Sequence, residues 1–87
     1  MPIKKVFTIE PGKYDSVRKA IINDLDGILL NFPLSQNKIE SYYIGKTGCS
    51  LFYNGEDAIA IGNSRLDRIN ETKSELEKKS GVELKSH

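Results

Sequence analysis

The stretch that decides the fold runs from Lys38 to Gly62 and reads KIESYYIGKTGCSLFYNGEDAIAIG. Gly48 interrupts it once, and Asn54-Gly55 interrupts it again with a strong hairpin signal, because both residues tolerate positive φ. The segments between these breaks are rich in β-branched and aromatic residues or alternate between small and large ones, which is typical of strands. We expect three consecutive strands, at 39–44, 49–53 and 58–61.

The residues before this stretch predict a strand, a helix and a second strand. The first strand covers 4–10 and ends at the turn dipeptide Pro11-Gly12. Apolar residues then recur every three to four positions over 13–26, which indicates an amphipathic helix. Gly27 is expected to end that helix in the left-handed conformation. An apolar strand over 28–32 follows, and a polar loop over 33–37 leads into the three-strand unit.

The residues after the three strands predict a second helix. Ser64 is a suitable N-cap, the helix is expected over 65–79, and Gly81 is expected to end it. Val82 and Leu84 either form a last short strand or tuck under the sheet.

Size and composition are those of one domain over residues 1–87. The formal net charge of +1 gives no general basic field, so nucleic-acid binding would depend on a local patch. Cys49 is alone and cannot form an intramolecular disulfide, and no apolar run approaches the roughly 20 residues that span a bilayer. We therefore expect a cytoplasmic protein with no membrane partner.

The sequence offers little for catalysis, and we expect no enzyme activity, no cofactor and no metal. The one histidine is His87, the last residue, where it is poorly placed to act as a base or a ligand. Gly45-Lys46-Thr47 is not a phosphate-binding loop, because that pattern needs a glycine where Glu40 stands and a helix afterwards.

The predicted order is strand, helix, four strands, helix. It corresponds to an α+β fold with a curved five-stranded antiparallel sheet and both helices on one face. Residues 51–62 read as apolar strand, small-residue turn, apolar strand and glycine, Lys46-Thr47 lies in the preceding turn, and Ser64 opens the next helix. In these features the chain resembles a single repeat of the TATA-box-binding-protein family, a fold also found as the N-terminal domain of type III ribonuclease H. A ferredoxin-like arrangement with 82–85 as its last strand is the alternative.

The resemblance implies a non-catalytic module that binds nucleic acid, duplex DNA first of all, through the open face of its sheet. Large side chains on that face would enter a widened minor groove and wedge between base steps. Leu51 and Tyr53 would lie on the wedge strand, with Ile59 and Ile61 on its neighbour. The family pairs two repeats in one chain, so a homodimer would supply the second repeat here.

The residues alone leave two assignments of the sheet faces open. One face would carry mostly large residues: Ile28, Leu30, Phe32, Leu51, Tyr53, Ile59 and Ile61. The other would carry Leu29, Asn31, Ser50, Phe52, Ala58 and Ala60. The free energy of burying apolar area favours the large residues against the helices. The resemblance favours the reverse.

Further candidate binding residues come from strand positions and strand ends. Tyr43 is assigned to the open face, where a tyrosine suits base stacking or protein contact. Lys38 and Lys46 lie at strand ends and could reach phosphates. Three more lysines would join them if the termini lie near the sheet: Lys4, Lys5 and Lys85. The alternative function is a protein-binding adaptor or inhibitor that uses the sheet face or an edge strand.

Overall fold

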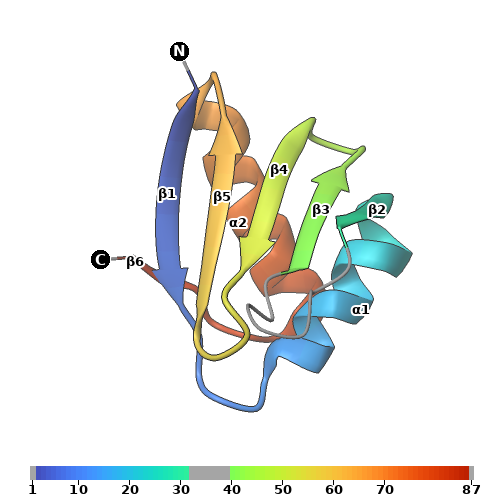
Figure 1. The fold of residues 1–87 in the computed structure, drawn as a ribbon, viewed down its shortest axis with the longest axis vertical. Helices are drawn as coiled ribbons and strands as arrows, with labels where there is room; N and C mark the ends of the chain where they lie inside the picture. The colour runs from blue at the N-terminus through green and yellow to red at the C-terminus, as the bar shows by residue number, and fades with distance from the viewer. Residues whose placement is uncertain (1, 32–39, 87) are drawn as a thin grey trace.

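A computed structural model of the chain describes residues 2–31 and 40–86. Its elements are β1 (Ile3–Thr8), α1 (Tyr14–Asp24), β2 (Gly27–Asn31), β3 (Glu40–Ile44), β4 (Cys49–Tyr53), β5 (Ala58–Asn63), α2 (Leu66–Ser80) and β6 (Lys85–Ser86). Within the described residues the strands form one open antiparallel sheet in the order β2-β3-β4-β5-β1-β6 (Figure 1). The predicted α+β class with an antiparallel sheet and two helices is confirmed.

The predicted number of five strands is wrong, because the C-terminal segment adds a sixth. Val82 and Leu84 are buried, and the chain then turns so that Lys85 and Ser86 pair with Thr8 and Phe7 at the edge of β1. The ferredoxin-like alternative with a last strand over 82–85 is also wrong, since four strands lie between the helices. The loop predicted over 33–37 lies outside the described residues.

The two hairpins form through the expected turn residues. Gly48 has a φ of 77°, and its N–H donates to the carbonyl of Ile44 at 2.7 Å. Gly55 has a φ of 89°, and the side-chain oxygen of Asn54 accepts backbone N–H groups from residues 56, 57 and 58 at 2.8, 3.1 and 3.0 Å. The first bond closes the turn between β3 and β4, and the three bonds to Asn54 close the turn between β4 and β5.

The helix ends agree with the sequence prediction at one place and differ at two. Gly81 ends α2 in the left-handed conformation and donates its N–H to the carbonyl of Glu77, as predicted. At the end of α1 the left-handed residue is Asp26, with a φ of 53°, and not Gly27. At the start of α2 the side chain of Asn63, and not Ser64, accepts the backbone N–H of Arg65, at 2.9 Å.

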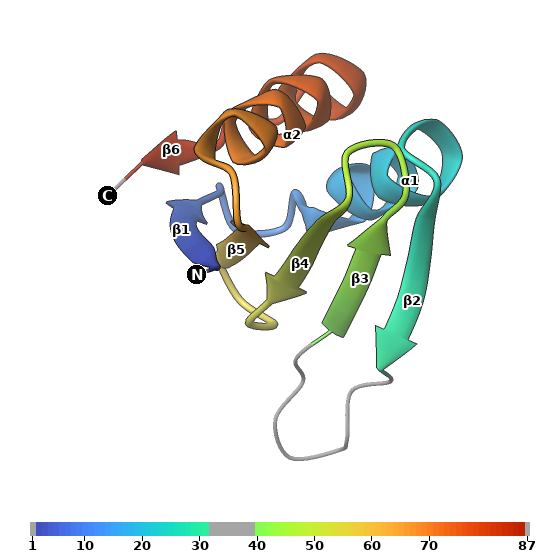
Figure 2. The same ribbon diagram turned by 90° about the horizontal axis from the view of Figure 1, so that it is seen from above.

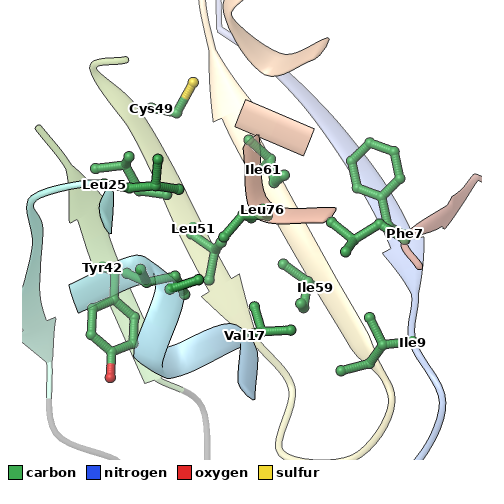
Figure 3. Packing of buried hydrophobic residues seen from close by; sticks show 14 of the residues in the cluster. Phe7, Ile9, Val17, Leu25, Tyr42, Cys49, Leu51, Ile59, Ile61 and Leu76 are labelled. Atoms are coloured by element: carbon green, nitrogen blue, oxygen red, sulfur yellow. The ribbon is translucent and has the colours of Figure 1, made fainter. Parts of the chain in front are cut away.

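Both helices lie on the same side of the sheet (Figure 2). The core fills the space between them and the sheet (Figure 3). Every element except β2 and β6 contributes at least one fully buried large side chain, among them Phe7, Ile21, Ile44, Leu51, Ile59 and Leu76. Among residues 2–31 and 40–86, no helix lies on the opposite side of the sheet, and we call that side the open face.

Glu77 fastens the C-terminal segment to α2. Its carboxylate accepts the N–H of Leu84 at 2.8 Å and an N–H of the Lys73 ammonium at 3.1 Å. Burial alone would raise the pKa of Glu77, but these two hydrogen bonds outweigh it and the pKa falls below its usual value. The charged form is therefore favoured in the folded chain.

We expect Glu77→Gln to lower the free energy of unfolding by about 1 kcal/mol at pH 7. Because the folded-state pKa is lower than the unfolded one, the contribution is complete above the unfolded value of about 4.3 and is lost as the pH falls through the folded value. Urea unfolding should show a larger difference between Glu77→Gln and the wild type at pH 7 than near pH 3. Glu83→Gln, on the exposed stretch between Val82 and Leu84, is the control and should change neither value.

Candidate functional site

The large aliphatic residues that the resemblance places on the open face are in the core instead. Leu51, Ile59 and Ile61 are 0% exposed and pack between the sheet and the helices (Figure 3). Their assignment to a nucleic-acid interface is therefore wrong. The cause is the free energy of burial, since isoleucine and leucine remove more apolar area from water than the small residues with which they alternate.

Tyr53 also lies on the helix side of the sheet. Its ring stacks on Tyr14 of α1, with 3.5 Å between ring centroids and 5° between ring planes. Burial raises the pKa of Tyr53 above its usual value, and its hydroxyl donates to the carbonyl of Glu56 at 3.2 Å. The ring is occupied within the fold, so its assignment to a wedge in DNA is wrong.

The lysines expected at strand ends do not gather on the open face. Lys46 turns toward α2, where its ammonium lies 2.6 Å from the carboxylate of Glu75, and its contact with phosphate stays a prediction. Lys5 lies on the helix side of β1 with Phe7, its ammonium 5.8 Å from that ring centroid. Lys38 is outside the described residues.

The predicted grouping of β2 with the other strands, in which Ile28 shares a face with Leu51, is wrong. Leu29 lies opposite the buried Tyr42 of β3, whereas Ile28 lies opposite Tyr43. Residues directly opposite each other share a side of the sheet, so Ile28 belongs to the open face and Leu29 to the helix side. A shift of one residue in the expected pairing is enough to exchange all the faces of a strand.

Strand pairing defines what the open face does carry. Its positions in β1 and β6 are Lys4, Val6, Thr8 and Lys85. Its positions in β5 and β4 are Ala58, Ala60, Gly62, Ser50 and Phe52. Its positions in β3 and β2 include Ser41, Tyr43 and Ile28. Tyr43 is 42% exposed there, as the sequence predicts.

Small residues make β5 the lowest strand of this face. Ala58, Ala60 and Gly62 form a floor, while longer side chains rise from β1 on one side and β4 on the other. We call this feature the β5 trough. Neighbouring strands lie about 4.8 Å apart, so the strands on its two sides are about 10 Å apart.

One lysine reaches across the β5 trough. Lys4 lies opposite Gly62, and its ammonium is 4.8 Å from the ring centroid of Phe52 on β4. That distance is within the range of a cation–π interaction. Tyr43 lies beside this pair on β3, because Phe52 is opposite Ser41 and Tyr43 is opposite Ser50. The face thus carries an ammonium–ring pair and, on the neighbouring strand, a second aromatic residue.

The charge on this face has one sign. Among its described strand positions the charged residues are Lys4 and Lys85. Glu40 of β3 lies on the helix side, where its carboxylate is 2.7 Å from the guanidinium of Arg18. The open face can therefore attract an anionic ligand locally although the chain is nearly neutral overall.

A polar cluster on the helix side is the competing candidate site. Arg18 of α1 donates to Glu40 and to Asp15, and the hydroxyl of Tyr42 donates to Glu40 at 3.3 Å. Burial, and then the nearby Glu40, raises the pKa of Tyr14 above its usual range, so this phenol stays neutral and is a poor proton donor or acceptor. The cluster joins α1 to β3, and we interpret it as structural.

The metal-ligating residues and the cysteine of the described part of the chain are further candidates. No group of three or more histidine, cysteine or acidic residues could hold a metal ion there. Cys49 is buried, and its sulfur accepts the hydroxyl of Thr72 at 3.1 Å, so it packs as a core residue. No described helix is both long and apolar enough to cross a membrane.

Fold and face together define an α+β chain with an open antiparallel sheet, two helices on one side and an aromatic, locally basic surface on the other. Comparison with known proteins adds no relative: no family model, curated protein or solved structure matches the chain.

Of the six predicted site residues that the structure describes, Tyr43 alone is on the open face. Lys85 and Lys4 join it, as expected if the termini lie near the sheet, and Phe52 is the aromatic residue that the sequence reasoning set aside. The strict alternation of residues 58–62 could have indicated which face is open, because the isoleucines of that stretch gain most free energy from burial and the small residues between them therefore face outward.

Proposed function

We propose that this chain is a non-catalytic nucleic-acid-binding module of the TATA-box-binding-protein-like class that uses the open face of its sheet. The order β1, α1, four strands and α2 supports the class, with β6 as an addition. The observation that carries the function is the cluster of Lys4, Phe52 and Tyr43 on a face whose charged strand positions are lysines.

The binding mode differs from a minor-groove wedge. Leu51, Ile59 and Ile61 are fully buried and would have to leave the core to reach a base step. Phe52 and Tyr43 take their place as the ring-bearing residues, and Lys4 and Lys85 are available to phosphates.

The test is the affinity of the full chain for labelled nucleic acids at low salt, measured by fluorescence anisotropy. We expect micromolar binding that Lys4→Glu weakens at least tenfold. Lys19→Glu makes the same change of formal charge on the exposed surface of α1 and should have little effect. Absence of binding to single-stranded and duplex DNA and RNA would overturn the proposal. An equal loss of affinity in Lys4→Glu and Lys19→Glu would show that the open face is not the binding surface.

A protein partner is the second candidate, and the edge of the sheet favours it. β2 is an edge strand in the described part of the sheet, and Ile28 and Leu30 are 58% and 59% exposed, which is unusual for large aliphatic side chains. A partner could add a strand there, and a second copy of this chain would do so symmetrically. Sedimentation should then show concentration-dependent association that Leu30→Lys abolishes. If the wild type is a monomer at all concentrations, pairing with a second copy is excluded.

A further inference from the structure

The β5 trough has the dimensions of a channel for one extended chain. Its floor consists of Ala58, Ala60 and Gly62, and it runs along β5 for roughly 15 Å at about 3.4 Å per residue. Its walls are side chains of β1 and β4, about 10 Å apart. On the side of β1, Lys4 and Val6 stand beside the floor, and on the side of β4, Ser50 and Phe52 do so.

The floor is what allows Lys4 to reach Phe52. The lysine starts on β1, two strands away from the ring, and its path crosses β5 at the level of Gly62 and Ala60. A larger residue at either position would stand in that path. In the structure the ammonium therefore lies over the one ring of β4 that faces outward.

A hollow at the end of the trough lies next to the same two side chains. It is an open depression of about 450 Å³ and lies where β5 leads toward α2. Lys4, Phe52 and Gly62 line it together with the polar residues Ser50, Asn63 and Ser64. Apolar and hydrogen-bonding groups are thus both available beside the ring.

We propose that the ligand of the open face is a single-stranded nucleic acid lying along the β5 trough, with one base stacked on Phe52 and the next on Tyr43. This inference rests on the proposed function and specifies its ligand. Phe52 and Tyr43 are diagonal neighbours on adjacent strands, about 7–8 Å apart, and neighbouring aromatic residues on a sheet can stack successive unpaired bases. Lys4 moves from the ring to a phosphate when the base arrives.

The structure favours a single strand over a duplex for two reasons. Bases inside a duplex are stacked on each other, so their faces are not free for Phe52 and Tyr43, whereas the bases of a single strand are. The face also has few cations. With Lys4 and Lys85 as its described charges, about two phosphates are neutralised, and stacking must supply the rest of the free energy.

The test compares a labelled oligo(dT), an oligo(U) and a mixed-sequence duplex, all of equal length, by anisotropy titration of the full chain. We expect either single strand to bind at least tenfold more tightly than the duplex. The slope of log K against log salt should be near −1.4, from about −0.7 for each of two phosphates.

Three variants locate the strand. Phe52→Leu keeps an apolar side chain but removes the ring, and it should weaken single-strand binding about tenfold or more, within the 1–3 kcal/mol expected for one stacked base. Phe52→Trp should retain the affinity. Ala60→Leu fills the trough and should also weaken binding, whereas Ile22→Ala, on the exposed surface of α1, is the control.

The outcomes separate this inference from the proposed function. Duplex binding equal to or tighter than single-strand binding would overturn the inference and leave the proposed function in place. Single-strand binding that Phe52→Leu leaves unchanged, in a variant with an unaltered circular dichroism spectrum, would overturn the stacking assignment. No binding of any of the three probes would overturn both.

Discussion

Leu51→Ala is expected to lower the free energy of unfolding by about 2–5 kcal/mol, while Phe52→Ala, one residue further along β4, should lower it by about 1 kcal/mol or less. Leu51 is fully buried between strands β3 and β5, opposite Tyr42 and Ile61, so its loss leaves a cavity in the core. Phe52 is partly exposed on the open face, and truncating it leaves no enclosed cavity.

Urea unfolding of the two variants and the wild type measures this difference directly. Because the two residues are consecutive on one strand, they share its local sequence and differ in the face they occupy. A larger loss for Phe52→Ala than for Leu51→Ala would mean that the helices cover the other face. The large aliphatic residues would then be free for a ligand, and the placement of the ligand on Phe52 would fail.

Gly27→Ala is the second change with a large expected effect, a loss of about 3 kcal/mol or more. A Cβ at Gly27 would lie 2.6 Å from the carbonyl oxygen of Ile21 and closer still to the methyl group of that side chain. The carbonyl belongs to α1, so the clash can be relieved only if the helix moves relative to β2. Overpacking against backbone is more costly than overpacking against a flexible side chain.

Gly12→Ala is the matched control for this effect. Gly12 has a φ of 85° with nothing within 4 Å of its hypothetical Cβ, so it tests backbone strain without a clash. Forcing alanine into the left-handed region lowers the free energy of unfolding by about 1–2 kcal/mol. Thermal and urea unfolding should therefore rank Gly27→Ala as the more destabilising variant, and the opposite order would contradict the close approach of α1 to β2.

The secondary structure could be predicted largely from local signals, and its errors have local causes. Asn54-Gly55 and Gly48 gave the correct turns because each turn type needs particular residues. The sequence predicts Ser64 as the N-cap of α2, whereas the N-cap is Arg65, which has no side-chain cap. The side chain of Asn63 instead accepts the backbone N–H of Arg65, just before the helix. The sequence predicts Gly27 as a left-handed helix terminator, whereas the structure requires glycine there because a Cβ would clash with Ile21.

The faces of the sheet were harder to predict than its strands. Alternation in residues 58–62 separates two faces but does not say which one the helices cover. Burial of apolar area gave the correct answer for Ile59 and Ile61, and the family resemblance gave the wrong one. For β2, a run of three consecutive aliphatic residues has no alternation, so its register, and with it the position of Ile28, could not be read from the sequence.

The candidate site depends on contacts between distant parts of the chain. Lys4 and Phe52 are far apart in sequence and meet because β5 lies between β1 and β4 and bears small residues there. No local pattern indicates such a contact. The position of Tyr43 could be predicted, because Tyr42 and Tyr43 are consecutive on one strand and point to opposite faces of the sheet. Tyr42 packs inward, so Tyr43 lies on the open face.

The position of Lys4 also affects how the unliganded protein behaves in a crowded solution. A bare aromatic ring beside a strip of alanines would invite unspecific adhesion to other macromolecules. The ammonium covers that ring with a hydrated charge, at a distance of 4.8 Å, and can swing aside on its flexible stem. We therefore expect the lysine that would bind a phosphate in the complex to keep the unliganded surface hydrated and to lower its tendency to aggregate.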